Sequence, residues 1–405
     1  MAAEKRLRFE QVDLVRVESK ADFVSAIGDP TDAARRISEL HFIGHSGMYG
    51  PMFRTTDMPE QFSPHERRHL SIPFSDDGTA WFHACRTARW FAPFFARTFK
   101  VPTYGYHWYT TFSGSPERFK WERGTQGPLY LVGCPGRKSH GLLGTAMKYL
   151  GLTAVEEMKR HEPKELTDED TYERVAGLYD AVFEDIRVRA DEWRWLNQHL
   201  PSGGALRLLD VGCGNGALLD ALRPLITHAV GVDRSPAMIE VARRRRAHEK
   251  LRFEIVDGPV IPLADQSVDV VVSLLSFRYL DWDPIMNEMR RVLVPGGRIL
   301  IIDMVTVPLE LPSWPLFFRS VFSAVFQRWR RPGFRKALAN LVADEGWQTM
   351  LKYNPIRAQH EFVWYLESRF PGRKVETLNV GRNARVLGFD SGPLEPGQVA
   401  PQSYP

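Results

Sequence analysis

The chain has 405 residues, of which 43% are hydrophobic and 25% are charged, and these proportions are ordinary for a soluble globular protein. The length predicts two or three domains. The net charge of +4 is too small to indicate nucleic-acid binding, so no nucleic-acid partner is expected. Three cysteines are too few for a disulfide framework, the N-terminus lacks the apolar core of a signal peptide, and no apolar run is long enough to span a bilayer. A cytoplasmic protein is therefore expected.

Residues 1–160 show segments typical of strands and helices in alternation. Strand-like runs are predicted at 12–18, 40–47 and 79–85, and helices at 33–37 and 86–99. Such alternation predicts a layered α/β domain. His45 lies at the end of one predicted strand and Cys85 at the end of the next, and open α/β sheets place their sites at strand carboxyl ends.

Cys85 and His45 together are suited to nucleophilic catalysis, because a neutral histidine can convert a thiol into a thiolate. The run Ala84-Cys85-Arg86 matches part of the caspase signature, and a histidine lies upstream at a comparable interval. Residues 12–152 thereby resemble the caspase-like fold of clan CD cysteine peptidases, including the bacterial CHAT group. The resemblance implies Cys85 as nucleophile and His45 as base or orienting group. The alternatives are an inactive recognition module and an unrelated α/β domain in which Cys85 only packs.

A polar stretch at 161–170 separates this region from a run of apolar and aromatic side chains at helical spacing. We place the domain boundary there, with a second domain over 161–390 and a disordered tail, rich in Pro, Gly and Gln, over 391–405. In the helical run, which covers 171–196, Tyr172, Val175 and Tyr179 share one face. This helix is expected to pack against the sheet that follows.

The most informative stretch of the chain is Leu206–Gly216, LRLLDVGCGNG. A strand ends in Asp210, and three glycines on alternate positions then let a ligand approach the main chain. Such a strand, loop and helix unit is the nucleotide-binding corner of a doubly wound sheet. The loop also fits the dinucleotide fingerprint, but the Asp210 carboxylate would repel a pyrophosphate. A ligand with an ammonium and a sulfonium, such as S-adenosylmethionine, would be attracted.

Four further strand-like segments follow, at 228–233, 251–258, 267–273 and 293–304. Their continuous Val, Ile and Leu content is typical of parallel strands that are covered on both faces. The motifs LDVGCGNG, GVD, VDG, SVDVVVS and LVPGGR stand in this order along the chain. They resemble those of the class I S-adenosylmethionine-dependent methyltransferases, which implies an α/β, Rossmann-like domain with seven strands.

The resemblance implies a site for S-adenosyl-L-methionine as the cofactor, and no metal is expected. Asp233 is expected to accept hydrogen bonds from ribose hydroxyls, and Asp257 with Gly258 to meet the adenine edge. The pattern around Tyr179 is similar to that of small-molecule methyltransferases whose N-terminal helix covers the cofactor. The implied cofactor residues are Tyr179, Asp210, Gly212, Gly214, Gly216, Asp233, Arg234, Asp257, Gly258 and Ser273.

Residues 307–372 are predicted to be an insertion that selects the substrate. Its part from 311 to 343 carries six basic residues and no acidic one, and an apolar stripe at helical spacing consists of Trp314, Phe318, Val321, Phe322, Val325 and Trp329. This cationic amphipathic helix is expected to be a lid or interdomain helix whose stripe packs inward. Peripheral contact with an anionic membrane, or with a protein, is the alternative. An apolar or aromatic acceptor is favoured in either case.

Methyl transfer from a sulfonium chiefly needs positioning and exclusion of water. A hydroxyl or amine acceptor also needs a base, and Tyr279, Asp281 or Asp283 could supply it. The predicted function is methyl transfer to a small-molecule or lipid-like acceptor, with an appended caspase-like domain. The alternatives are a cysteine peptidase regulated by a domain that binds S-adenosylmethionine, and a two-domain scaffold that binds without catalysis.

Overall fold

The structure, a computed structural model, describes residues 13–28, 36–47, 49–53, 60–62, 70–113, 130–134, 146, 150, 157–163, 171–307, 313–330, 332–353, 356–381 and 384–394. Contacts divide the chain into two compact units, Met1–Glu165 with Tyr404–Pro405, and Leu166–Ser403. Each unit has a hydrophobic core of its own. In the described part of the chain, no helix combines the length and apolarity that a membrane span requires.

The second unit is built on a seven-stranded sheet. In spatial order its strands are β12 (Leu251–Ile255), β11 (Ile226–Asp233), β10 (Leu206–Val211), β13 (Val268–Leu274), β14 (Leu293–Thr306), β16 (Ala384–Asp390) and β15 (Glu376–Val380). β16 runs antiparallel to both of its neighbours, and the other strand pairs are parallel. The strand order reverses between β10 and β13, which is where open α/β sheets bind ligands. This topology confirms the Rossmann-like fold predicted for the region.

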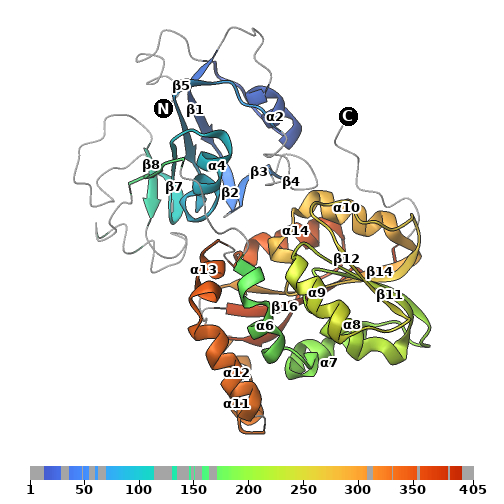
Figure 1. Cartoon of the computed structure of the whole chain (residues 1–405). Helices are drawn as coiled ribbons and strands as arrows, with labels where there is room; N and C mark the ends of the chain where they lie inside the picture. Colours follow the sequence, from blue (N-terminus) through green and yellow to red (C-terminus); the bar gives the residue numbers. More distant parts are fainter. Residues whose placement is uncertain are drawn as a thin grey trace. The chain divides into compact units, whose positions relative to one another are not determined.

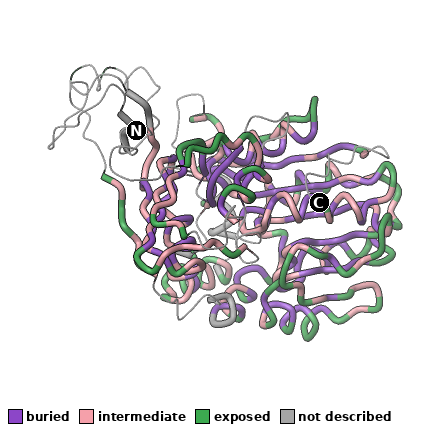
Figure 2. Tube along the Cα trace, turned by 90° about the horizontal axis from the view of Figure 1, so that it is seen from above, coloured by how far each residue is buried: buried purple, intermediate pink, exposed green. Residues whose placement is uncertain are grey.

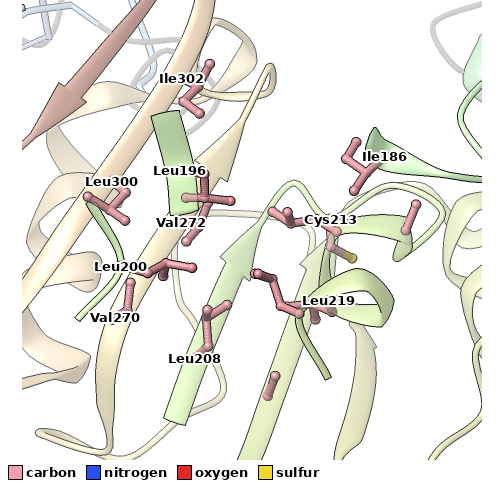
Figure 3. Close-up of a cluster of buried hydrophobic side chains, with 14 of the residues drawn as sticks. Ile186, Leu196, Leu200, Leu208, Cys213, Leu219, Val270, Val272, Leu300 and Ile302 are labelled. Carbon is pink, nitrogen blue, oxygen red and sulfur yellow. The ribbon is translucent and has the colours of Figure 1, made fainter. Parts of the chain in front are cut away.

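Helices cover both faces of this sheet (Figure 1). One face packs against α7 (Ala190–His199), α8 (Ala217–Leu222) and α9 (Pro236–Arg245), and the other against α10 (Trp282–Val292) and α14 (Gln359–Arg369). Buried residues, purple in Figure 2, follow the strands. Neighbouring residues of a strand pack into hydrophobic cores on opposite faces of the sheet. Leu208 belongs to the core beneath α7, α8 and α9, shown in Figure 3, and Leu209 to the core beneath α10 and α14. Strands with both faces covered need continuous apolar runs, which explains the pattern in the sequence.

The predicted helix over 171–196 is divided in the structure. α6 (Thr171–Val182) is followed by the short helix η3 (Ile186–Val188) and then by α7. From the insertion, α12 (Pro332–Ala343) and α13 (Glu345–Tyr353) contact α6, and an apolar cluster that includes Val175, Val182 and Leu341 lies between them. The insertion therefore packs on the helix that precedes the glycine loop.

The remaining helix of the insertion, α11 (Trp314–Arg330), lies along β15. The expectation that its apolar stripe packs inward is wrong for the five stripe residues whose side chains are described, since each is between 42% and 74% exposed. The opposite face of the helix meets the sheet instead. There the Val380 N–H donates a hydrogen bond to Ser320 Oγ at 3.1 Å.

The first unit is also α/β. Its main sheet has the order β1 (Ile37–Ile43), β5 (Phe74–His83), β6 (Thr103–Gly105) and β9 (Lys159–His161). The first three strands are parallel and β9 is antiparallel. α2 (Lys20–Gly28) and α4 (Phe91–Phe99) supply core residues such as Phe23, Phe91 and Phe95. Two smaller sheets consist of β2 (His45–Gly47), β3 (Gly50–Phe53) and β4 (Glu60–Gln61), and of β7 (Tyr109–Ser113) and β8 (Tyr130–Cys134).

Three expectations for the chain ends and the first unit need correction. Residues 13–18 form no strand, and the first described helix is α2, in which Phe23 and Ile27 are buried at a spacing of four residues. The helix expected at 33–37 lies mostly outside the described residues, and Ile37 begins β1. The tail is ordered through 391–394, because the Leu394 N–H donates to the Gly297 carbonyl at 2.9 Å. Residues 395–405 lie outside the described residues.

Candidate functional site

The loop after β10 depends on glycine conformations. Gly212, Gly214 and Gly216 have φ angles of +77°, +51° and +77°, values that side chains other than glycine rarely adopt. A Cβ on Gly212 would come within 2.3 Å of the Ser276 side chain, and one on Gly216 within 2.6 Å of the Phe253 ring. A Cβ on Gly214 would meet nothing closer than the Tyr179 ring at 3.9 Å. Gly212 and Gly216 thus allow close packing of the protein itself, and Gly214 faces the open side of the loop.

A cavity of about 30 Å³ lies over this loop. Its lining comes from α6 and the residues after it, from the glycine loop and the start of α8, and from the end of β13. The lining residues are Tyr179, Phe183, Ile186, Arg189, Asp210, Gly212, Cys213, Gly214, Asn215, Leu218, Leu274 and Leu275. The fold therefore gathers four of the predicted cofactor residues, Tyr179, Asp210, Gly212 and Gly214, around one cavity.

Asp210 is the most unusual group of this cavity. Its side chain is only 1% exposed, and its Oδ1 atom has no hydrogen-bond partner among the described residues. Burial, and then the negative charge of Asp233, raise the pKa of Asp210 to about 8. A buried carboxylate without a partner is costly, so a cationic donor in the cavity would be bound strongly.

Asp233 ends β11 and holds the glycine loop. The Gly214 N–H donates to Asp233 Oδ2 at 2.9 Å, and the Ser235 N–H donates to Oδ1 at 2.9 Å. Burial raises the pKa of Asp233, although these hydrogen bonds act in the opposite direction. A carboxylate offers about four acceptor positions, so ribose hydroxyls can still be accepted beside the two main-chain donors.

Asp180, the residue after Tyr179, ties α6 to the loop. Asn215 Nδ2 donates to Asp180 Oδ1 at 2.9 Å, and Arg246 Nη1 donates to the same oxygen at 3.1 Å. The other carboxylate oxygen pairs with Arg245 at 2.9 Å. Asp180, Asn215 and Arg246 are all buried. The sequence prediction missed this network, although Asp180 lies beside Tyr179 and Asn215 lies between two loop glycines.

The other predicted cofactor residues lie outside the lining of this cavity. Arg234 is exposed, and Asp257 and Gly258 are exposed beyond the end of β12. Ser273 is fully buried, and its hydroxyl lies 2.8 Å from that of Ser276. The neighbours of Ser273 in the chain, Leu274 and Leu275, line the cavity instead. The sequence prediction missed them because an apolar strand end does not reveal which residues turn toward a ligand.

The candidate bases lie at the start of α10 and in the short helix η5 (Phe277–Tyr279). The Tyr279 hydroxyl accepts a hydrogen bond from Arg278 at 2.8 Å. Asp281 precedes α10 at its N-cap position, and its side chain makes no capping bond there. The Asp283 carboxylate pairs with Arg369 and accepts a hydrogen bond from the Tyr365 hydroxyl at 3.1 Å. Asp283 is thus held by a structural contact, and Tyr279 and Asp281 stay predictions.

Beside Tyr279, Arg278 forms a buried ion pair with Asp303 of β14. Burial raises the pKa of Asp303, and the Arg278 guanidinium opposes that rise. The pair fixes η5 against the sheet at the edge of the expected acceptor pocket.

In the first unit, His45 and Cys85 follow the neighbouring parallel strands β1 and β5. The two segments touch, because Ser46 Oγ donates a hydrogen bond to the Cys85 carbonyl. His45 is exposed. The Cys85 sulfur lies against Thr110, whose N–H donates to it at 3.3 Å and whose hydroxyl lies at 3.4 Å. The structure therefore brings the two predicted residues to one edge of the sheet without showing a catalytic pair. Among the described residues, no group of three or more His, Cys, Asp or Glu side chains could hold a metal ion.

Comparisons with known proteins find a family match within the second unit. Residues 209–301 match the family model described as a methyltransferase domain. The chain is 32% identical over 165 residues to a demethylmenaquinone methyltransferase of Thermus thermophilus, covering 39% of this chain and 72% of that enzyme. It is also 32% identical over 157 residues to one from Clavibacter sepedonicus, covering 37% of this chain and 64% of that enzyme. The second match thus spans less than two thirds of that relative's length.

A solved S-adenosylmethionine-dependent methyltransferase from Mesorhizobium loti is 28% identical, covering 28% of this chain and 54% of that chain, with a TM-score of 0.27. The family match begins in β10 and ends in β14, so it contains the glycine loop and Asp233. The sequence matches, together with the strand order, assign the family. Through its second unit, the chain belongs to the class I S-adenosylmethionine-dependent methyltransferases.

Proposed function

We propose that this protein transfers a methyl group from S-adenosyl-L-methionine to a small, apolar acceptor with a quinone-like or other aromatic ring. The observation that carries the proposal is the buried carboxyl of Asp210 in the cavity over the glycine loop, with Oδ1 lacking a partner among the described residues. That atom suits the ammonium of an amino-acid ligand, whose positive charge would favour the ionised form of Asp210, whereas a pyrophosphate would disfavour that form. The names of the two relatives, both demethylmenaquinone methyltransferases, support a quinone-like acceptor.

The cofactor would supply a methyl group carried on a positively charged sulfur. Asp210 would accept hydrogen bonds from its ammonium, and Asp233 would accept them from its ribose hydroxyls. Asp257 and Gly258, which follow β12, are proposed to meet the adenine edge. Tyr179 lines the cavity from α6, so we propose that it covers the cofactor and excludes water.

The size of the cavity sets a condition on binding. Its volume is about 30 Å³, whereas pockets for drug-sized ligands measure roughly 300–1,000 Å³. We therefore propose that α6 and η3 move outward as the cofactor enters and close again over it. The Asp180–Asn215 hydrogen bond would be the contact that limits this opening.

The acceptor would lie beside apolar and aromatic side chains. Tyr179 lies 4.7 Å from Phe183 and 6.1 Å from Trp347 of α13, measured between ring centroids. These rings join the cofactor cavity to the insertion over 307–372, which we propose selects the acceptor. If the acceptor is a hydroxyl or an amine, Tyr279 or Asp281 would remove its proton. If residues 311–343 contact a membrane or a protein, α11 and α12 would make that contact.

The first unit is proposed to recognise a partner, with neither His45 nor Cys85 reacting. We propose no peptidase activity, because the Cys85 sulfur is occupied by contacts with Thr110. A caspase-like fold for residues 1–160 stays a prediction. A thiol-directed activity probe that labels Cys85 in the folded protein would contradict this assignment.

Isothermal titration with S-adenosylmethionine tests the proposal. The wild-type chain should bind it and should not bind NAD, and Asp210→Asn and Asp233→Ala should each lose binding. Asp220→Asn is the matched control, because Asp220 lies on the nearby helix α8 and pairs with Arg223 at a partly exposed site. Binding of NAD in place of S-adenosylmethionine would refute the proposal.

A further inference from the structure

An apolar stripe covers one face of α11. It consists of Trp314, Phe318, Val321, Phe322 and Val325, which are 42%, 59%, 44%, 74% and 59% exposed. Residues three or four apart lie on the same face of a helix, so these five side chains form a continuous surface, which we call the α11 stripe. Apolar patches of this kind mark surfaces that bind a protein or a membrane.

The face of α11 opposite the stripe is fixed to the sheet. Arg319 donates a hydrogen bond to the Leu378 carbonyl at 2.8 Å, and Ser320 Oγ accepts one from the Val380 N–H. The Leu378 carbonyl and the Val380 N–H both belong to β15, so the α11 stripe faces away from this strand. In Figure 1, α11 and α12 form the lower end of the second unit.

The stretch of sequence that carries the stripe has charge of one sign. From 311 to 343 the sequence contains six basic residues and no acidic one, and Arg335 and Lys336 of α12 are exposed. A second copy of the chain placed on the stripe by a twofold axis would bring these cations face to face. A phosphate-bearing lipid surface would instead be attracted, and amphipathic helices with a basic polar face bind at such interfaces.

We propose that the α11 stripe inserts into the surface of an anionic membrane, with Arg335 and Lys336 of α12 contacting lipid phosphates. α11 lies in the plane of the membrane and does not cross it. α11 contacts α12, and α12 packs on α6, the helix that covers the cofactor cavity. Resting on the proposed function, this places the acceptor pocket beside the bilayer from which an apolar acceptor would enter.

Vesicle sedimentation with the full chain tests the docking surface. The wild type should bind vesicles of phosphatidylcholine with added phosphatidylglycerol, and should bind vesicles of phosphatidylcholine alone much more weakly. The double variant Phe318→Ser, Phe322→Ser should lose at least about tenfold in affinity. Its matched control is Val260→Ser, a 70% exposed apolar residue elsewhere in the same unit, which should bind like the wild type.

The charge contribution is tested separately. Arg335→Gln with Lys336→Gln should weaken binding to anionic vesicles about fivefold for each cation removed. Arg244→Gln on α9, whose side chain is 64% exposed, is the matched control and should change nothing. Added salt should weaken wild-type binding in the same direction.

Three outcomes would overturn the docking proposal. They are equal binding to neutral and anionic vesicles, vesicle binding that the stripe variant leaves unchanged, and a wild-type dimer that dissociates when the stripe is replaced. Titration with S-adenosylmethionine in solution separates the two proposals, since the stripe variants should keep wild-type affinity. Vesicle binding without cofactor binding would refute the proposed function alone.

Discussion

Replacing Asp210 by Asn should stabilise the protein that has no ligand and should abolish cofactor binding. In the folded protein Asp210 keeps its proton up to a pH of about 8, whereas the ordinary value of an aspartate is 3.8. Between these values the folded state binds more protons than the unfolded chain, so stability falls as the pH rises. At 1.36 kcal/mol per pKa unit, the loss approaches about 5 kcal/mol near pH 8. Asp210→Asn removes the ionisable group and therefore most of this loss.

Chemical denaturation near pH 5 and near pH 8 measures the effect. The stability gained through Asp210→Asn should be larger at the higher pH. Asp269→Asn is the control, because hydrogen bonds from Arg207 lower the pKa of Asp269. The Asp269 carboxyl is ionised at both pH values, so this variant should be slightly destabilised to the same extent at each. A loss of stability in Asp210→Asn near pH 8, or an unchanged pH dependence, would refute the reasoning.

Three further variants test the loop, the α6 network and the first unit. Gly216→Ala should destabilise by roughly 2–4 kcal/mol in thermal or chemical denaturation, because its Cβ would meet the Phe253 ring at 2.6 Å with φ at +77°. Asp180→Ala should cost roughly 3–5 kcal/mol, since it leaves the buried Arg246 cation without its carboxylate. It should also make α6 exchange its amide hydrogens faster. Cys85→Ser should leave methyl transfer and cofactor affinity unchanged, as measured by transfer of labelled methyl groups and by titration.

The chain offers controls for these variants. Gly177→Ala, in α6, places a Cβ in open space and should be neutral or slightly stabilising, because Ala favours helices. Glu184→Gln removes a largely exposed partner of Arg245 and should cost under about 1 kcal/mol. If Gly216→Ala were as harmless as Gly177→Ala, the inference that the glycine loop packs tightly against Phe253 would be wrong. Loss of methyl transfer in Cys85→Ser would give the first unit a chemical role.

The sequence predicted the parts of the fold that local pattern specifies. Continuous apolar runs predicted the parallel strands of the second unit, because strands covered on both faces have no polar side. The glycine spacing and Asp210 predicted the loop where the strand order reverses. The first unit was harder: residues 13–18 were predicted as a strand and α2 was missed, since short runs of mixed polarity fit either element.

Tertiary packing decided what the candidate site contains. The sequence could place Ser273 at a strand end, but the register of β13 buries it and turns Leu274 and Leu275 to the cavity. Only the fold brings Asp180 to Asn215, and only packing shows that the α11 stripe faces outward. Spacing along the chain determines which residues share a strand or a helix face. Distant segments, which converge only in the folded protein, determine what each face contacts. They also determine whether a buried carboxylate such as Asp210 has a hydrogen-bond partner.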